Sequence, residues 1–469
     1  MRLTFALLIT ILLLKTVLSI QPHHVWHAES DDRIDENSVD VRWLTQKLDH
    51  FNTQDTRTFQ QRYYVNATYY KPGVGPIFLS LGGEGELTSK WIQSGQCVDL
   101  AKEYGALVLG LEHRYYGKSQ PFAELPVENL RYLSSQQALA DVATLYEEAM
   151  TNFGLDPDKT TWISFGCSYS GALSLWLREK FPFMIDGAFS GSSPVLANKE
   201  YIEYDETCED SVGYSCMNHL VLAFDEIKTL LATNSGKETL SQKFNLCQEL
   251  DSDYWVNMFK YNIIGVIQGS VQYNNAPRGF PRVEMCRRLA RASDKFEEYV
   301  KLTNEMNGGL CFDLSLNSVV NQTAAPENNG RTWWWQKATE FAYYKNSPEG
   351  SDIFFPEIDL EFHNKVAEEI FGQPLKPHVE FTNSYYGAKS PVVSDVIITN
   401  GLYDPWSRLS ILTDMPNNVQ SVLYTSSGHC APVYPLITEG PDPTPEDVLL
   451  AREKVKNFVQ TVIDKKSSQ

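Results

Sequence analysis

Continuous apolar runs alternate with segments of helical periodicity along the first part of the chain. Residues 76–81 and 106–111 are apolar at nearly every position, and each run ends at a polar stretch that contains glycine. Such runs are typical of strands buried on both faces of a sheet. Within 133–153, apolar side chains recur at helical spacing, and another β-prone run follows at 160–165. This alternation predicts parallel strands joined by right-handed crossovers, and therefore a doubly wound α/β fold.

The pattern changes between residues 198 and 388. This block consists mainly of helical segments, such as 220–231 and 283–303, and it contains five of the eight cysteines. A strand-like pattern returns only after it. We therefore predict one α/β domain made of residues 41–197 and 389–469, with residues 198–388 inserted as a mainly helical cap.

Ser168 stands where a β-prone run meets a helix-prone run, in the stretch Gly166-Cys167-Ser168-Tyr169-Ser170-Gly171. In a nucleophile elbow, a strained strand-to-helix turn presents a serine hydroxyl at the end of a sheet and is flanked by small residues. The motif G-x-S-x-G has glycine where this chain has Ser170, but a small side chain suffices there. We predict Ser168 as a nucleophile, for which Ser170 is less suitable; the alternative is an ordinary turn.

A catalytic serine needs a base and an acid that orients the base, and in α/β-hydrolases both follow the serine along the chain. Four histidines follow Ser168, and only His429 lies outside the predicted cap, on a glycine-containing loop after an apolar strand. The apolar run 396–399 leads into Asp404, where the acid is expected. Either residue alone would be read as a turn or core residue, but their order favours a Ser168–Asp404–His429 triad.

An acyl-transfer site also needs N–H groups that stabilise the oxyanion. One normally belongs to the residue after the nucleophile, which here is Tyr169, and another comes from an earlier strand-end loop. The loop after the run 76–81 contains Gly83 and Glu84 and is the expected second source. The alternative for this loop is a tight turn without a ligand.

The N-terminal residues 1–19 have a charged start, a short apolar centre and small residues at the end, which is typical of a secretory signal peptide. Residues 20–40 lack periodicity and are predicted to form a mature tail or a pro-segment. Asn66 and Asn321 begin N-x-T glycosylation sequences, for which surface positions are expected. With eight cysteines, the chain suits an oxidising, secreted or lysosomal setting.

The acidic composition argues against two classes of partner. A formal net charge of −19 repels nucleic-acid backbones and anionic membrane surfaces. No apolar stretch is long enough for a confident membrane span, and no cysteine pair has the C-x-x-C spacing of a zinc site. We therefore expect no nucleic acid, no membrane span, no metal and no organic cofactor.

Several ordered blocks, together with the Ser168 elbow, resemble one family of peptidases. The blocks are Leu81-Gly82-Gly83-Glu84-Gly85, Glu112-His113-Arg114-Tyr115-Tyr116-Gly117-Lys118-Ser119, Tyr132-Leu133-Ser134-Ser135-Gln136-Gln137-Ala138-Leu139-Ala140-Asp141, Thr339-Glu340-Phe341-Ala342-Tyr343-Tyr344 and Asn400-Gly401-Leu402-Tyr403-Asp404-Pro405-Trp406. They resemble the prolylcarboxypeptidase, dipeptidyl-peptidase II and thymus-specific serine protease family, with most similarity to the thymus-specific branch.

This resemblance implies an α/β-hydrolase peptidase with a helical cap that cuts peptides near an end, often after proline, in lysosomes or outside cells. Ser168 would be the nucleophile, Asp404 the acid and His429 the base. Two departures from the family stand out: Cys167 replaces the usual glycine before the nucleophile, and Ala338 replaces a usual cysteine. The second departure puts a cap disulfide in doubt and makes Cys247 the candidate unpaired cysteine.

The resemblance leaves open which peptide end is held. A carboxylate at Glu84, Glu112 or Glu340 would bind a free amine, whereas Arg114 would bind a free carboxylate; all four could instead form internal ion pairs. The sequence thus predicts a serine exopeptidase of dipeptidyl-peptidase or Pro-Xaa carboxypeptidase type.

An esterase or lipase with the same triad and a non-catalytic binding protein remain alternatives, and a homodimer is a candidate assembly. Six aromatic residues of the cap could line a pocket for a proline ring, although for most of them a place in the cap core is the stronger expectation. They are Trp333, Trp334, Trp335, Phe341, Tyr343 and Tyr344.

Overall fold

Eight strands form one sheet in the computed structural model of the protein, which describes residues 39–274, 280–326, 328–438 and 443–468. The strands are β1 (Asp40–Lys47), β2 (Thr58–Asn66), β3 (Ile77–Leu81), β4 (Leu107–Leu111), β5 (Trp162–Cys167), β6 (Gly187–Gly191), β7 (Val396–Gly401) and β8 (Val419–Tyr424). Their order is β1-β2-β4-β3-β5-β6-β7-β8, antiparallel at β1–β2 and β2–β4 and parallel elsewhere. The predicted α/β-hydrolase fold is confirmed.

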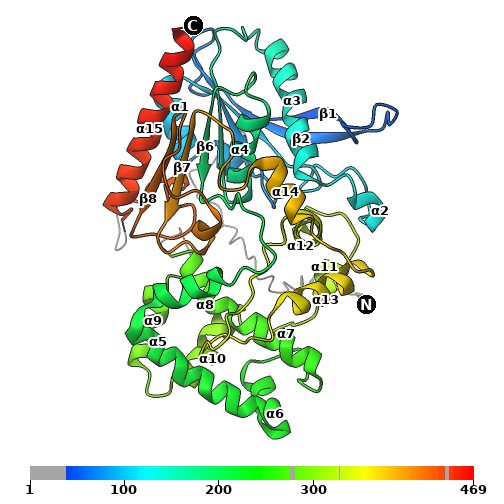
Figure 1. Cartoon of the computed structure of the whole chain (residues 1–469), viewed down its shortest axis with the longest axis vertical. Helices are drawn as coiled ribbons and strands as arrows, with labels where there is room; N and C mark the ends of the chain where they lie inside the picture. Colours follow the sequence, from blue (N-terminus) through cyan, green and yellow to red (C-terminus); the bar gives the residue numbers. More distant parts are fainter. Residues whose placement is uncertain (1–38, 275–279, 327, 439–442, 469) are drawn as a thin grey trace, which may run out of the picture.

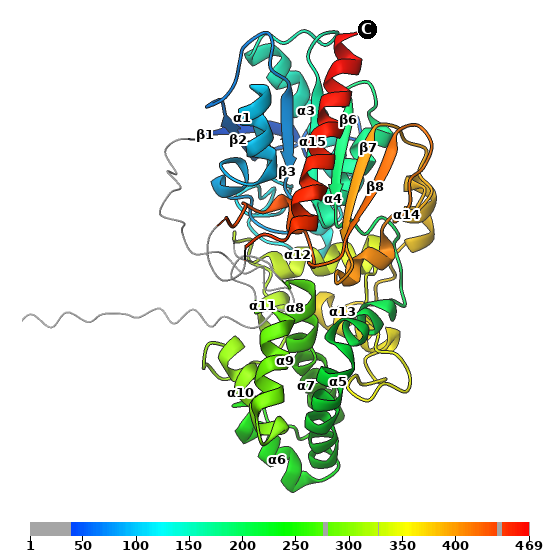
Figure 2. The same cartoon turned by 90° about the vertical axis from the view of Figure 1, so that its left-hand side faces the viewer.

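Helices cover both faces of the sheet. Two of them, α1 (Gln96–Tyr104) and α15 (Glu446–Ser467), lie on one face, and α3 (Ser135–Asn152) and α4 (Tyr169–Lys180) lie on the other (Figure 2). Side chains of β3 alternate between the two cores, because Phe78 packs with α1 whereas Ile77 and Leu79 pack with α3 and α4. This two-sided burial explains why β3 is apolar at nearly every position.

Helices fill the long connection between β6 and β7, and many of them lie below the sheet in Figure 1. They are α5 (Glu203–Leu231), α6 (Asn234–Lys243), α7 (Asp253–Ile263), α8 (Gly265–Gln272), α9 (Arg282–Arg291), α10 (Lys295–Met306), α11 (Asn317–Val320), α12 (Asn329–Gln336), α13 (Leu360–Phe371) and α14 (Val379–Tyr386). The inserted segment is thus mainly helical. Its last helix packs on the sheet domain, since Tyr386 stacks on Trp176 of α4 with ring centroids 4.0 Å apart.

Two disulfides hold the inserted helices together and correct one expectation. Cys216 pairs with Cys286, and Cys247 pairs with Cys311, so the expectation of an unpaired Cys247 is wrong. The two free cysteines are Cys97 and Cys208, both buried.

Two other local predictions differ from the structure. The segment 283–303 is two helices rather than one, because Asp294 caps α10 by accepting a hydrogen bond from the N–H of Glu297. Strand β1 begins inside the predicted tail 20–40, at Asp40, and is an edge strand with half-exposed Trp43. Because β1 is exposed on one face, its sequence has no continuous apolar run that would predict a strand.

Of the two glycosylation sequences, only one is placed as expected. Asn321 is exposed, and its Oδ1 accepts a hydrogen bond from the N–H of Thr323. Asn66 is only 6% exposed, and its Nδ2 donates to the carbonyl of Ile92, so the expectation of a surface position is wrong there. An amide nitrogen held inside the fold is a poor glycan acceptor, which leaves Asn321 as the candidate.

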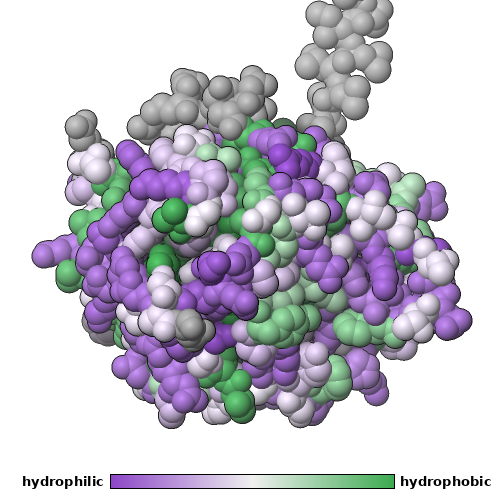
Figure 3. Space-filling view, turned by 90° about the horizontal axis from the view of Figure 1, so that it is seen from above, coloured by the Kyte–Doolittle hydropathy of each residue, from purple (hydrophilic) through white to green (hydrophobic). Residues whose placement is uncertain are grey.

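The surface is mixed in polarity. Figure 3 shows hydrophilic and hydrophobic residues interspersed over the upper face of the molecule. Among the described residues, no helix combines the length and apolar character needed to cross a bilayer. The predicted signal peptide 1–19 and nearly all of the predicted tail 20–40 lie outside the described residues.

Candidate active site

Ser168 lies in a strained turn between β5 and α4. Its backbone has φ 61° and ψ −131°, values that residues with a side chain rarely adopt. At Gly166 an added Cβ would meet the carbonyl oxygen of Ser170 at 2.0 Å, so only glycine fits there. This crowding is what the nucleophile-elbow prediction requires, and it leaves Ser168 partly exposed at the C-terminal end of the parallel strands.

Ser170 helps to form the turn. Its Oγ donates to the carbonyl of Cys167 at 2.8 Å and accepts from the N–H of the same residue at 3.0 Å. Both hydrogen-bonding directions of this hydroxyl are therefore used within the elbow. The structure thus gives Ser170 a local structural role, in line with its lower rank as a nucleophile.

His429 and Asp404 are paired in the same region. The Nδ1 atom of His429 lies 3.0 and 2.9 Å from the two carboxylate oxygens of Asp404, and both side chains are buried. Asp404 also accepts from the N–H of Trp406, so its carboxylate is fixed at the start of the turn Pro405–Leu409. The N–H of His429 donates to the carbonyl of Gln272 at 2.7 Å. These contacts leave Nε2 of the imidazole for another partner.

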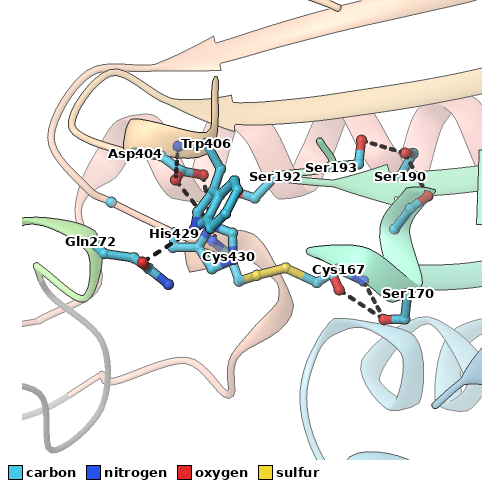
Figure 4. Close-up of a disulfide and its surroundings, with 12 residues drawn as sticks. Cys167, Ser170, Ser190, Ser192, Ser193, Gln272, Asp404, Trp406, His429 and Cys430 are labelled. Atoms are coloured by element: carbon cyan, nitrogen blue, oxygen red, sulfur yellow. Dashed lines mark hydrogen bonds and ion pairs between the residues drawn. A yellow bond between two sulfur atoms is a disulfide. The ribbon is translucent and has the colours of Figure 1, made fainter. Parts of the chain in front are cut away.

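A third disulfide connects the loops that carry Ser168 and His429. Cys167, directly before Ser168, is bonded to Cys430, directly after His429, across a sequence separation of 263 residues. Figure 4 shows this bond running between the elbow and the histidine loop. The pairing was not predicted, although each cysteine is next to a residue of the predicted triad. It places the two loops side by side.

The loop after β3 lies against the elbow, as expected for a source of an oxyanion-binding N–H. A Cβ added to Gly83 would come within 3.5 Å of the Cβ of Ser170. The backbone N–H of Glu84 bonds to its own carboxylate, an interaction that favours the ionised form of that side chain. Of the two residues expected to contribute with Tyr169, Gly83 is therefore the better placed donor.

The side chain of Tyr169 anchors the start of α4. Its hydroxyl lies 3.1 Å from Nε2 of His113 and accepts from Nε2 of Gln336 at 2.8 Å. Gln336 in turn accepts from the hydroxyl of Tyr116 at 2.6 Å. The backbone N–H after the predicted nucleophile is thus held by a buried polar network that connects the sheet domain with α12.

A cavity opens above Ser168 between the sheet domain and the inserted helices. Its lining residues come from both parts of the chain: Glu84, Ser168, Tyr169, Pro194, Gln272, Tyr273, Trp333, Tyr343 and Trp406. Glu84 is the only acidic residue among them, and no lysine or arginine of the described chain is in this lining. Burial raises the pKa of Glu84 above its usual value of 4.5, and the neighbouring His429 opposes this effect.

Two of the other three candidates for binding a peptide terminus are engaged elsewhere in ion pairs. Glu112 pairs with Arg62 at 2.5 Å and accepts from the hydroxyl of Ser119 at 2.6 Å. Arg114 forms a bidentate pair with Asp141, with distances of 2.8 and 2.6 Å. Neither residue lines the cavity at Ser168. Glu112 and Arg114 therefore form internal ion pairs, which was the alternative to binding a peptide terminus.

Glu340 also lies away from the cavity lining and acts within the fold. Its carboxylate accepts from the N–H of Ser135 at 3.0 Å and from the Ser135 hydroxyl at 2.5 Å, at the N-terminus of α3. Burial raises the pKa of Glu340 to about 7, although the bonds from Ser135 oppose the rise. The folded protein therefore holds this proton more tightly than the unfolded chain does.

Because of that shift, the contribution of Glu340 to stability should fall as pH rises from about 5 through 7. We expect Glu340→Gln to gain stability relative to the wild type over this range, by at most about 3 kcal/mol between pH 5 and 8. Urea unfolding at several pH values measures it. Glu361→Gln, at an exposed ion pair with Lys365, should show no such trend. A pH-independent difference for Glu340→Gln would contradict the assignment.

Only two of the six cap aromatics proposed for a proline pocket reach the cavity. They are Trp333 and Tyr343. The others pack inside the fold: Trp334 against Tyr344, Trp335 against Phe371, and Phe341 against Trp176. Trp334, Trp335 and Tyr344 therefore belong to the core of the inserted helices, whereas Phe341 packs on α4 of the sheet domain. The expectation that most of the six belong to the cap core is met for these three residues only.

Gln272 and Tyr273 complete the cavity, and neither was predicted from the sequence. Gln272 ends α8, and its Oε1 accepts from the hydroxyl of Tyr204 and from Nε1 of Trp406. Its carbonyl accepts from the N–H of His429, as described above. Gln272 thus joins the inserted helices to both loops that carry Asp404 and His429. A glutamine at the end of an unremarkable helix carries no motif that could have revealed this role.

Comparison with known proteins gives consistent matches over most of the chain. The family model described as Serine carboxypeptidase S28 matches residues 46–454. Mouse thymus-specific serine protease is 32% identical over 459 residues, covering 91% of this chain and 88% of the relative, and the human protein of that name is 31% identical with 90% and 86% coverage. Mouse lysosomal Pro-X carboxypeptidase is 26% identical, with 90% and 91% coverage.

Proposed function

Because the chain belongs to the serine carboxypeptidase S28 family, and is thus a serine-type peptidase, we propose that it is an exopeptidase that releases short fragments from the amino ends of peptides. Ser168, His429 and Asp404 form its catalytic triad. The observation that carries this proposal is the cavity in which Ser168 and Glu84 face the same space. A carboxylate beside the nucleophile suits a substrate with a free amine.

The reaction proceeds through an acyl-enzyme. Ser168 Oγ attacks the scissile carbonyl while Nε2 of His429 takes the hydroxyl proton, and Asp404 holds the imidazole through Nδ1. The N–H groups of Tyr169 and Gly83 stabilise the oxyanion. His429 then gives the proton to the leaving amine, and water hydrolyses the acyl-enzyme in the second half-reaction. These residues suffice for each step.

The inserted helices restrict the length of chain that reaches Ser168. Gln272, Tyr273, Trp333 and Tyr343 all come from the segment between β6 and β7, and they line the cavity opposite the elbow. A site covered in this way admits a chain end more readily than the middle of a folded polypeptide. This arrangement supports an exopeptidase with residues 198–388 as its cap.

Aromatic rings dominate the remaining lining. Tyr169, Tyr273, Trp333, Tyr343 and Trp406 surround the space next to Ser168. A proline ring stacks well on such surfaces and has no N–H that would need a partner. We propose that the enzyme prefers substrates with proline near the cleaved bond, as the name of the Pro-X carboxypeptidase relatives also suggests.

A carboxypeptidase is the second candidate, because relatives carry that name. Such an enzyme needs a cation for the substrate carboxylate, and the described cavity lining has neither lysine nor arginine. Arg114, the cation suggested by the sequence, is bound to Asp141. Amino-end cleavage is therefore the better supported of the two. The esterase alternative is tested by comparing ester and peptide turnover.

Product analysis tests the direction of cleavage. Four versions of one proline-containing peptide, with each end free or blocked by acetylation or amidation, are incubated with the enzyme and analysed by mass spectrometry. We expect cleavage only when the amino end is free, regardless of the carboxyl end. Cleavage that depends on a free carboxyl end would establish the carboxypeptidase. Efficient internal cutting of the doubly blocked peptide would contradict the proposal that the inserted helices restrict access to Ser168.

Glu84→Gln should weaken the use of free-amine substrates without affecting the fold. Loss of a charge-assisted hydrogen bond costs about 1.5–3 kcal/mol, so kcat/KM should fall by about 10- to 150-fold. Because the pKa of Glu84 is raised and only its ionised form attracts an ammonium group, wild-type substrate affinity should also fall as pH drops through that pKa. Glu84→Gln should lack this pH-dependent fall in substrate affinity.

Steady-state kinetics from pH 4 to 8 measures both effects. Glu86→Gln is the matched control, because Glu86 lies two residues away and pairs with Arg62 at 2.8 Å outside the cavity lining. Equal losses in the two variants would indicate a general effect on the loop. An unchanged kcat/KM in Glu84→Gln would remove the basis for amino-end recognition.

The disulfides bear on the compartment in which the enzyme works. Three disulfides in the described chain suit an oxidising compartment, and some relatives are named lysosomal. We propose a secreted or lysosomal peptidase that enters the secretory pathway through the N-terminal segment. Peptides are its proposed partners, and a homodimer stays a prediction.

A further inference from the structure

The Cys167–Cys430 disulfide lies inside the candidate active site and brings two sulfur atoms to the catalytic histidine. The sulfur atoms and a ring nitrogen of His429 lie within 4.8 Å of one another. The cap disulfides Cys216–Cys286 and Cys247–Cys311 belong to no such cluster among the described residues. While the disulfide is intact, its sulfurs are bonded to each other and are unavailable as thiolate ligands.

Reduction would turn this cluster into the donor set of a zinc site. Two thiolates and one imidazole, with a fourth position open to water, are a known set of ligands for zinc. In a tetrahedral site the ligand atoms lie about 3.5–3.8 Å from one another, which is compatible with the present separations once the sulfurs part. Cys167 is partly exposed and directly precedes Ser168, which lines the cavity, so we expect a small reductant and an ion to approach from there.

The surroundings of His429 match those of a zinc-binding histidine. Such a ligand almost always donates its other ring N–H to a carboxylate or carbonyl, which fixes the ring. Asp404 accepts from Nδ1 here, so Nε2 is the atom left to bind a metal. The contacts that prepare His429 for proton transfer therefore also prepare it as a ligand.

We propose that reduction of Cys167–Cys430 creates a zinc site of Cys167, Cys430 and His429, and that zinc bound there switches the peptidase off. A small dithiol reduces the S–S bond to two thiols and is itself oxidised to a disulfide. Zinc(II) then replaces the two thiol protons, which are released to solvent. The predicted inhibition rests on the proposed function, because zinc occupies the nitrogen that would accept the Ser168 proton. The predicted binding of zinc does not depend on the proposed function.

The test uses the full-length protein, reduced with dithiothreitol, freed of reductant without oxygen, and mixed with zinc chloride. Bound zinc is determined by elemental analysis after gel filtration, and peptidase activity is measured on the same sample. We expect the reduced protein to bind one zinc ion per chain more than the oxidised protein. Activity should fall by about 100-fold or more on zinc addition, the lower range of a general-base contribution, and return with a chelator.

Three variants assign the site. Cys167→Ala/Cys430→Ala should lose the additional zinc and the zinc-dependent inhibition. Cys247→Ala/Cys311→Ala, which lacks the more exposed cap disulfide, should keep both. Ser168→Ala should bind zinc like the wild type although it is inactive, which separates failure of this site from failure of the proposed triad.

Several outcomes would overturn the proposal. Reduced wild-type protein that binds no additional zinc would do so, as would equal zinc binding by Cys167→Ala/Cys430→Ala. If reduction unfolds the protein, activity is lost without zinc and a chelator does not restore it. Circular dichroism of the same samples shows whether reduction has unfolded the protein. Unfolding on reduction would also contradict a zinc-controlled site.

Discussion

Replacing Ser168 with alanine is expected to lower kcat for peptide hydrolysis by about four to six orders of magnitude. Only the hydroxyl is removed, so the fold, the disulfides and substrate binding should persist. Activity measured at high enzyme concentration, with circular dichroism as the check on folding, gives the result. Near wild-type turnover in this variant would refute Ser168 as the nucleophile.

Ser170→Ala is the matched control for that variant. The Ser170 hydroxyl bonds to the backbone of Cys167 rather than facing the cavity, so its loss should cost some stability and leave most of the activity. The two serines lie two residues apart in the same elbow. If the activities of the two variants were reversed, the nucleophile would be Ser170.

The second large effect is expected for Asp404→Asn. An amide at this position can donate to Nδ1 of His429 and so stabilise the wrong tautomer, which leaves Nε2 protonated and unable to act as a base. We expect kcat to fall by about 10⁴-fold with a smaller change in KM. Steady-state kinetics and an unfolding curve distinguish this loss from misfolding.

Asp447→Asn provides the comparison for Asp404. Asp447 holds the same histidine loop from α15 by accepting from the N–H groups of Thr425 and Ser426, but it does not touch His429. Its replacement should affect stability more than kcat. Equal losses of kcat in the two variants would mean that loop placement, and not the imidazole–carboxylate pair, limits the reaction.

Sequence order alone selected the three residues of the predicted triad. Ser168, Asp404 and His429 each follow an apolar strand, and the parallel strands end at one edge of the sheet. At that edge His429 pairs with Asp404, and a disulfide joins the loops of Ser168 and His429. Strong local patterns also predicted the sheet, because strands such as β3 are buried on both faces. These features depend on periodicity and chain order, which a single sequence contains.

Other features depend on packing between distant segments and could not be predicted. Glu84, Glu112 and Glu340 are equivalent in the sequence, and only the fold shows that Glu84 faces the cavity whereas the other two bind Arg62 and Ser135. Cysteine connectivity is similarly ambiguous without a structure. Edge strand β1 was not predicted, because a half-exposed strand lacks a continuous apolar run.

The most direct test of the triad is the site at which a fluorophosphonate modifies the wild-type protein. Such reagents trap an activated serine, and peptide sequencing by tandem mass spectrometry distinguishes Ser168 from Ser170. We predict one adduct per chain, on Ser168, and none in the Asp404→Asn variant over the same time. An adduct on Ser170, or no adduct on an active preparation, would contradict the assignment of Ser168, His429 and Asp404 as the catalytic triad.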